Sequence, residues 1–290
     1  MTIPPRLVRV SLTLAAVAVA IAAGLYLWAL YMDSPWTRDG RVRADVLQIA
    51  PDVSGFVTAI EVVDNQKVAR GDLLFTIDAE RYRIAVSRAE ATVAALQEQA
   101  AQRQRESTRR NQLGSNAITA ESREQAASAA AQAQASLRQA EADLDAARLN
   151  LARTEVRAPV NGYVTNLQLH LGDYASGGRP VFAIVDSDSF YVVGYFEETK
   201  LAAIREGADA SIRLMGFDTA IPGKVAGIAR AIVDREAAQG SDLLANVNPT
   251  FSWVRLAQRI PVRIALGPVP AEVRLSAGMT ATIVIDQGTN

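Results

Sequence analysis

Two stretches of the chain decide its fold: Ala50-Pro51-Asp52-Val53-Ser54-Gly55-Phe56-Val57-Thr58 and Ala158-Pro159-Val160-Asn161-Gly162-Tyr163-Val164-Thr165. Both open with Ala-Pro and then place a glycine, an aromatic residue, a valine and a threonine in the same order. The likeness continues, because Gly71 follows Gly55 by 16 residues and Gly178 follows Gly162 by the same distance. Each copy closes with an apolar run and an acid. A repeat of this kind predicts two half-motifs that assemble into one β-sandwich.

A helical insert, residues 79–153, separates the two copies and contains no proline, one glycine and 22 alanines. Candidate seam positions, all but one of them occupied by apolar or aromatic residues, recur in it at alternating spacings of four and three, a period of 3.5 residues. In the first arm these are Tyr82, Val86, Ala89, Val93, Leu96 and Ala100, and in the second Arg123, Ala126, Ala130, Ala133, Leu137, Ala140, Leu144, Ala147 and Leu151. We therefore expect an antiparallel coiled-coil hairpin that turns at residues 113–116, with arms of roughly 50 Å.

The N-terminal region predicts a single membrane-spanning helix. Residues 10–32 carry no charge, and 23 helical residues reach roughly 34 Å, enough for a hydrocarbon core of about 30 Å. Arg6 and Arg9 precede this run and Asp33 follows it, so the positive-inside rule places residues 1–9 in the cytoplasm and everything after Asp33 outside. The run is long for a signal peptide, although the small residues 18–22 leave cleavage open as an alternative.

These segments predict an α+β chain with nested domains. Residues 33–49 with 189–290 are assigned to a second β-domain, which the family resemblance given below implies to be a membrane-proximal β-barrel. Residues 50–78 with 154–188 form the two halves of the β-sandwich, which the same resemblance implies to be lipoyl-like, and residues 79–153 form the α-helical hairpin. A short helix is expected around residues 197–205.

Composition and motifs argue against several functions. A formal net charge of −1 leaves no basic excess for nucleic acid. The chain has no cysteine and a single histidine, His170, and no H-E-x-x-H, G-x-S-x-G or Walker pattern, so we expect no enzyme. The acids Asp33, Asp39 and Asp45 show no spacing that specifies a metal.

With the repeat and the hairpin in view, the chain resembles the periplasmic adaptors, or membrane fusion proteins, of the haemolysin-secretion type. The likeness is greatest to the adaptor subunit of aromatic carboxylic acid (p-hydroxybenzoic acid) efflux pumps, and it extends over nearly the whole chain. It rests on the residues 34–39, 49–55, 63–66, 189–192, 196–201 and 253–263.

The resemblance implies an adaptor in a tripartite efflux pump, anchored in the inner (cytoplasmic) membrane. Its partners would be an inner-membrane transporter, an outer-membrane channel and further copies of itself in a ring. Aromatic carboxylic acids are the implied cargo, and the arginines Arg255, Arg259 and Arg263 are candidates for a cationic lining. Two alternatives remain: an adaptor of a multidrug exporter, and a membrane-tethered scaffold without a transport role.

The resemblance also implies that Arg109, Leu113 and Thr119 at the hairpin tip dock the outer-membrane channel, with Thr119 where serine is usual. An exposed leucine seats in a groove between partner helices, and polar groups beside it form hydrogen bonds. A purely structural interpretation also stands: Leu113 closes the hairpin end, and Thr119 caps the second helix.

Trp36, Arg38, Asp39 and Arg41 follow the predicted span and are candidates for contact with the transporter, or simply the interface anchor and first barrel strand. Lipoyl domains carry their cofactor on a lysine at a hairpin apex. Here the apices are residues 64–66 and 171–173, and Lys67 lies one position past the first. We therefore expect no lipoyl or biotinyl group and no other cofactor.

Overall fold

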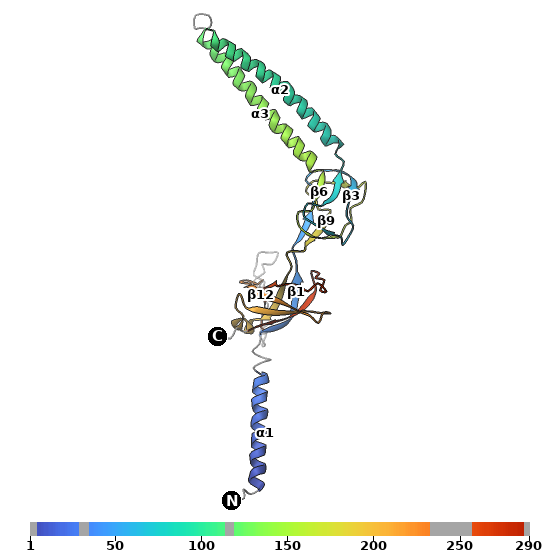
Figure 1. Cartoon of the computed structure of the whole chain (residues 1–290), viewed down its shortest axis with the longest axis vertical. Coiled ribbons are helices and arrows are strands. Elements are labelled where there is room, and N and C mark those ends of the chain that lie inside the picture. Colours follow the sequence, from blue (N-terminus) through green and yellow to red (C-terminus); the bar gives the residue numbers. More distant parts are fainter. Residues whose placement is uncertain (1–4, 29–34, 114–118, 233–256, 287–290) are drawn as a thin grey trace, which may run out of the picture. The chain divides into compact units, whose positions relative to one another are not determined.

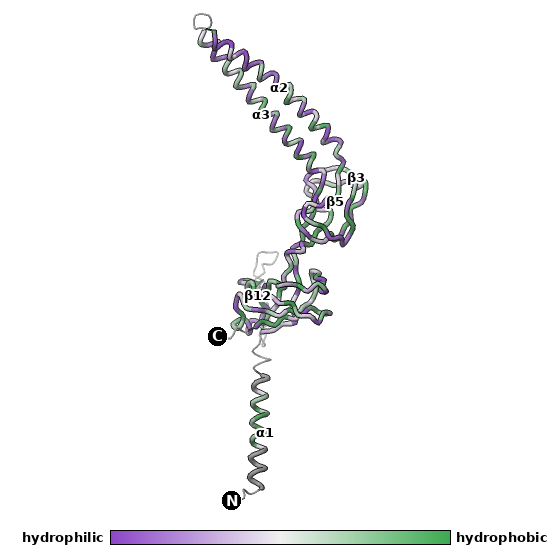
Figure 2. Tube along the Cα trace, in the orientation of Figure 1, coloured by the Kyte–Doolittle hydropathy of each residue, from purple (hydrophilic) through white to green (hydrophobic). Residues whose placement is uncertain are grey.

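The computed structural model describes residues 5–28, 35–113, 119–232 and 257–286 (Figure 1). The N-terminal helix α1 (Pro5–Trp28) exposes the apolar side chains Leu14, Val17, Val19 and Ile21, and its coloured part is hydrophobic in Figure 2. No helix among the described residues is long and apolar enough to cross a membrane. Residues 29–32 of the predicted span, and Asp33 after it, lie outside the described part, so the span stays a prediction.

The predicted β-sandwich is present, and its two halves exchange strands. The first half supplies β2 (Val46–Ile49), β3 (Gly55–Ile60), β4 (Lys67–Val68) and β5 (Leu73–Ile77), and the second supplies β6 (Glu155–Arg157), β7 (Gly162–Thr165), β8 (Tyr174–Ala175) and β9 (Phe182–Asp186). One sheet has the order β2-β9-β7-β4 and the other β6-β5-β3-β8. Each sheet therefore takes two strands from each half, in the same relative order.

The glycines that begin the repeat mark a close approach in both halves. A Cβ on Gly55 would lie 2.6 Å from Cγ2 of Ile77, and one on Gly162 would lie 2.8 Å from Cγ2 of Ile184, its counterpart, and 2.2 Å from the Val185 carbonyl oxygen. No side chain fits at such distances. The core between the sheets includes the equivalent rings Phe75 and Phe182, which meet edge to face at 5.9 Å.

The hairpin consists of α2 (Glu80–Gln112) and α3 (Ala120–Ala152), which lie side by side in Figure 1. The predicted seam is confirmed for α3, where the buried residues are Ala126, Ala130, Ala133, Leu137, Ala140 and Leu144. In α2 only Ala100 and Ser107 are buried, and the other predicted seam positions are partly exposed. Alanine along the seam allows close approach of the two helices. The predicted turn residues 114–116 lie outside the described residues.

Several bonds fix the base of the hairpin to the sandwich. The Tyr82 hydroxyl donates to the Ser54 carbonyl at 2.8 Å, and the Arg81 guanidinium donates to the same oxygen. Arg81 also bonds the Tyr82 hydroxyl, which raises the pKa of Arg81 above its usual value. From α3, Arg153 pairs with Asp52. Both helices are thus anchored to the loop that precedes β3.

The remaining strands close the predicted β-barrel. Its order is β1 (Trp36–Arg43), β10 (Tyr191–Glu197), β13 (Arg259–Leu266), β12 (Ala220–Ile228), β11 (Asp209–Leu214) and β14 (Thr280–Ile285), with β14 paired back to β1. All pairs are antiparallel. Inward and outward residues alternate along the strands, as a closed barrel requires, except where β1 has a bulge between Thr37 and Gly40. The core includes Val42, Val192, Phe196, Ile212, Ile221, Ile264, Ile283 and Ile285.

One domain boundary differs from the sequence-based expectation. Residues 46–49, which were predicted with the barrel, form β2 and pair with β9 in the sandwich. Strand pairing decides this, because the alternation in 46–49 fits either sheet until its partner strand is known. The short helix expected around residues 197–205 is present as the 3-10 helix η2 (Glu198–Ala203).

Candidate functional site

All three predicted docking residues, Arg109, Leu113 and Thr119, are exposed in the described part of the hairpin tip. Arg109 and Leu113 are both exposed, and the Leu113 side chain keeps 44% of its accessible surface. Leu113 ends α2, where its backbone N–H donates to the Arg109 carbonyl at 3.3 Å. A leucine left this open at a helix end is available to fill an apolar groove on a partner.

Thr119 is the N-cap of α3, as the structural interpretation of this residue anticipates. Its Oγ1 accepts a hydrogen bond from the Ser122 backbone N–H at 3.2 Å. This bond satisfies one of the free N–H groups in the first turn of the helix. Thr119 is also exposed, so part of its side chain stays accessible to a partner while the hydroxyl caps α3.

A brace between the arms, which the sequence did not reveal, lies directly behind the tip. Arg110 Nη1 donates to Ser122 Oγ at 3.2 Å, while Arg110 Nη2 pairs with Glu106. Ser122 is also the residue capped by Thr119. The brace therefore links the end of α2 to the start of α3 and fixes where both helices present their terminal side chains. Its only signal in sequence is the i, i+4 spacing of Glu106 and Arg110.

Three of the four predicted transporter-contact residues line one pocket of about 380 Å³ on the barrel. Trp36 and Asp39 are partly exposed and Arg38 is exposed. The Trp36 ring forms two cation–π contacts, with Arg38 Cζ 5.5 Å and Lys200 Nζ 5.2 Å from the ring centroid. Such contacts are worth about 0.5–1 kcal/mol at exposed sites. Arg259 pairs with Asp39 at the same pocket.

Arg41 does not line this pocket. Its Nη1 donates to Thr280 Oγ1 on β14 at 3.0 Å. Of the arginines suggested as a cationic lining, Arg259 and Arg263 are exposed on the outside of the barrel, and Arg263 lies 3.8 Å over the Tyr191 ring. Arg255 lies outside the described residues. The outer face of the barrel is thus rich in arginine and aromatic rings.

Neither predicted apex of the sandwich has the form of a lipoyl carrier. Asn65 and Gly172 occupy equivalent turns with positive φ of 64° and 87°. Lys67 is exposed but lies on β4, paired with Tyr163, rather than at the apex. Within the described ranges, no group of three or more His, Cys, Asp or Glu side chains is placed to hold a metal.

Comparison with known families now accounts for this architecture. The model of the RND membrane fusion protein barrel-sandwich hybrid domain matches residues 45–187, and that of the AAEA-like β-barrel domain matches residues 189–286. The uncharacterized protein YdhJ of Escherichia coli K12 is 47% identical over 275 residues, covering 95% of this chain and 96% of its own. The chain belongs to the RND membrane fusion protein family.

Solved structures show the same fold at low sequence identity. MacA from Actinobacillus actinomycetemcomitans is 19% identical to this membrane fusion protein with a TM-score of 0.65, covering 87% of this chain and 78% of its own. The membrane fusion protein Spr0693 from Streptococcus pneumoniae R6 is 18% identical with a TM-score of 0.62, covering 87% and 98%. Family membership supports the expectation that this membrane fusion protein is an adaptor rather than an enzyme.

Proposed function

We propose that this membrane fusion protein is the periplasmic adaptor of a tripartite efflux pump, linking an inner-membrane transporter to an outer-membrane channel. The nested architecture carries the proposal. A barrel and a split sandwich support a hairpin whose polar arms bury only a narrow seam, and whose end holds an exposed leucine. This hairpin adds little to a globular core, and an extended antiparallel pair with an open tip fits a reach toward a partner.

The proposal places the N-terminal segment in the inner membrane as a single span, with the bulk of the chain in the periplasm. Support comes from the uncharged run at residues 10–32 and from the exposed apolar side chains of α1. Apolar side chains that are exposed on an isolated helix favour a lipid environment. Membrane fractionation with alkaline extraction tests this, since a span stays in the pellet and a peripheral protein is released.

Aromatic carboxylic acids are the proposed cargo, as the resemblance to aromatic acid efflux adaptors implies. The exposed arginines on the outside of the barrel support an acidic rather than a cationic cargo, because guanidinium groups pair with carboxylates. The test compares strains that lack the gene, challenged with hydroxybenzoates or with lipophilic cations. Sensitivity to the acids alone supports the proposed cargo, and sensitivity to the cations alone transfers the proposal to a multidrug exporter.

The decisive experiment is co-purification from crosslinked cells of the native protein, a Leu113→Asp variant and a Leu149→Asp control. Leu149 is also an exposed leucine of the hairpin, at 55% of its accessible surface, but it lies near the base of α3. We expect both partners with the native protein, loss of the channel alone with Leu113→Asp, and no change with Leu149→Asp. Recovery of neither partner would refute the adaptor proposal and favour the membrane-tethered scaffold.

A further inference from the structure

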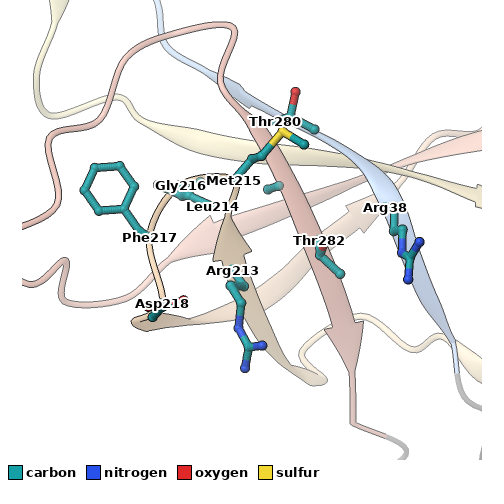
Figure 3. Close-up of a pocket in the computed structure, with 10 residues that line it drawn as sticks. Arg38, Arg213, Leu214, Met215, Gly216, Phe217, Asp218, Thr280 and Thr282 are labelled. Atoms are coloured by element: carbon teal, nitrogen blue, oxygen red, sulfur yellow. The ribbon is translucent and has the colours of Figure 1, made fainter.

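A second pocket on the barrel has the side chains of an anion site. It shares only Arg38 with the Trp36 pocket. It has a volume of about 410 Å³ and lies where β1, β14 and β11 meet. Figure 3 shows Arg38 and Arg213 on either side of Thr282. The lining further includes Leu214, Met215, Phe217, Asp218 and Thr280.

Strand register explains why two arginines line the same pocket. Arg213 of β11 is paired with Thr282 of β14. On the other side of β14, the pairing with β1 shifts between Thr37 and Gly40, so Arg38 lies in a bulge opposite Thr282. The bulge is held by the buried Thr37, whose Oγ1 donates to the Tyr195 carbonyl at 2.8 Å and accepts from the Asp39 N–H at 3.1 Å. Bulges of this kind re-aim a side chain at a functional position.

The charged side chains of the pocket lining are two arginines and one acid, Asp218. In the part of the chain that the structure describes, neither Arg38 nor Arg213 forms an ion pair. Asp218 lines the pocket but pairs with neither arginine. Arg41 adds a third cation at the edge through its hydrogen bond to Thr280. Two guanidinium groups beside threonine hydroxyls are well suited to a carboxylate or another small anion.

Part of the pocket lining is apolar. The turn after β11 carries Met215, which is 79% exposed, and Phe217, which packs partly on the barrel core. Gly216 between them has a φ of +97°, a left-handed conformation that glycine adopts without strain. This turn therefore adds a thioether and a ring to the lining that contains the two arginines, and these supply apolar surface for the body of an organic anion.

From this arrangement we infer that the pocket between Arg38 and Arg213 binds a small organic anion with an apolar body, of which an aromatic carboxylate is the representative. The inference rests on the proposed export function for its biological meaning, since the pocket would then hold cargo. Binding itself is a property of the purified protein and is measured independently of transport.

The test uses the purified full chain in detergent and 4-fluorobenzoate as the probe, followed by fluorine NMR. We expect saturable binding that falls about tenfold or more in Arg213→Gln, in line with the loss of a charge-assisted hydrogen bond. Thr282→Val, which removes only a hydroxyl, should weaken it to a smaller degree. Arg43→Gln is the matched control, because Arg43 is exposed on β1 but does not line the pocket.

Three results would overturn the inference. Equal binding of neutral 4-fluorobenzyl alcohol would show that the arginines do not recognise the carboxylate. Equal loss in Arg43→Gln would show diffuse attraction to the barrel surface rather than a site. Binding of anionic phospholipid vesicles, with none of free 4-fluorobenzoate, would make the pocket a lipid phosphate site.

The outcomes for the pocket and for the pump are separable. A strain that keeps gene-dependent resistance to hydroxybenzoate while the protein shows no binding retains the proposed function and refutes the pocket. Binding that depends on Arg213, in a protein that confers no resistance, supports the pocket and refutes the proposed cargo.

Discussion

Substituting alanine for the repeat glycines should damage the two halves of the sandwich unequally. In Gly162→Ala the new Cβ would lie 2.2 Å from the backbone oxygen of Val185, so β7 and β9 must separate. In Gly55→Ala it meets only the Ile77 methyl, at 2.6 Å. Overpacking typically costs about 1–3 kcal/mol. We place Gly162→Ala at the upper end, about 2–3 kcal/mol, and Gly55→Ala at about 1–2 kcal/mol.

Hydrogen exchange read by mass spectrometry measures this locally. A loss of about 2–3 kcal/mol accelerates exchange of β9 amides about 30- to 150-fold where exchange follows the opening equilibrium. Gly227→Ala is the control, because nothing lies within 4 Å of its Cβ. Barrel strand β13 should exchange as in the native protein in both sandwich variants. Equal exchange in β9 for Gly162→Ala and Gly227→Ala would refute the reasoning from close approach.

Other consequences of the structure can be tested in the same way. Leu144→Ala removes a buried seam residue and should lower hairpin stability by about 2–3 kcal/mol, whereas Leu149→Ala, at an exposed position, should change the thermal midpoint of helix circular dichroism little. Thr119→Ala should cost about 1 kcal/mol through loss of the N-cap and speed amide exchange at Ser122, and Thr119→Ser should restore it. The intact mass should equal that of the unmodified chain, and a lipoyl-sized addition that disappears in Lys67→Arg would contradict the expectation of no cofactor.

The sandwich and the hairpin could be predicted because their signals are periodic. Gly55 and Gly162 recur with their neighbours, so one observation fixed both halves and their relation. The seam of α3 followed from spacing alone, and five of its alanine and leucine positions from Ala126 to Ala140 are buried as expected. Local patterns of this kind do not depend on knowledge of distant partners.

The features that depend on distant pairing were not predictable in the same way. The bulge that carries Arg38 exists only because β1 pairs with β14, more than two hundred positions away. Arg213 likewise shares a pocket with Arg38 only once the barrel strands are paired. The Arg110 brace required knowledge of where the two helices cross. The three proposed docking residues, Arg109, Leu113 and Thr119, come from the resemblance, and their exposure is what the structure adds.

The pairing of strands from the two halves of the sandwich also affects how the chain folds and how the length of the hairpin arms can vary. The β5 and β6 strands are far apart in sequence but adjacent in space, with the Ile77 N–H bonded to the Thr154 carbonyl at 2.9 Å. Once the helical hairpin between them has formed, β5 and β6 are already close together. Their pairing then no longer carries the entropic cost of closing a long loop. The arms can therefore gain or lose matched seven-residue units while the seam and the sandwich are preserved, so that reach varies independently of the body that supports it.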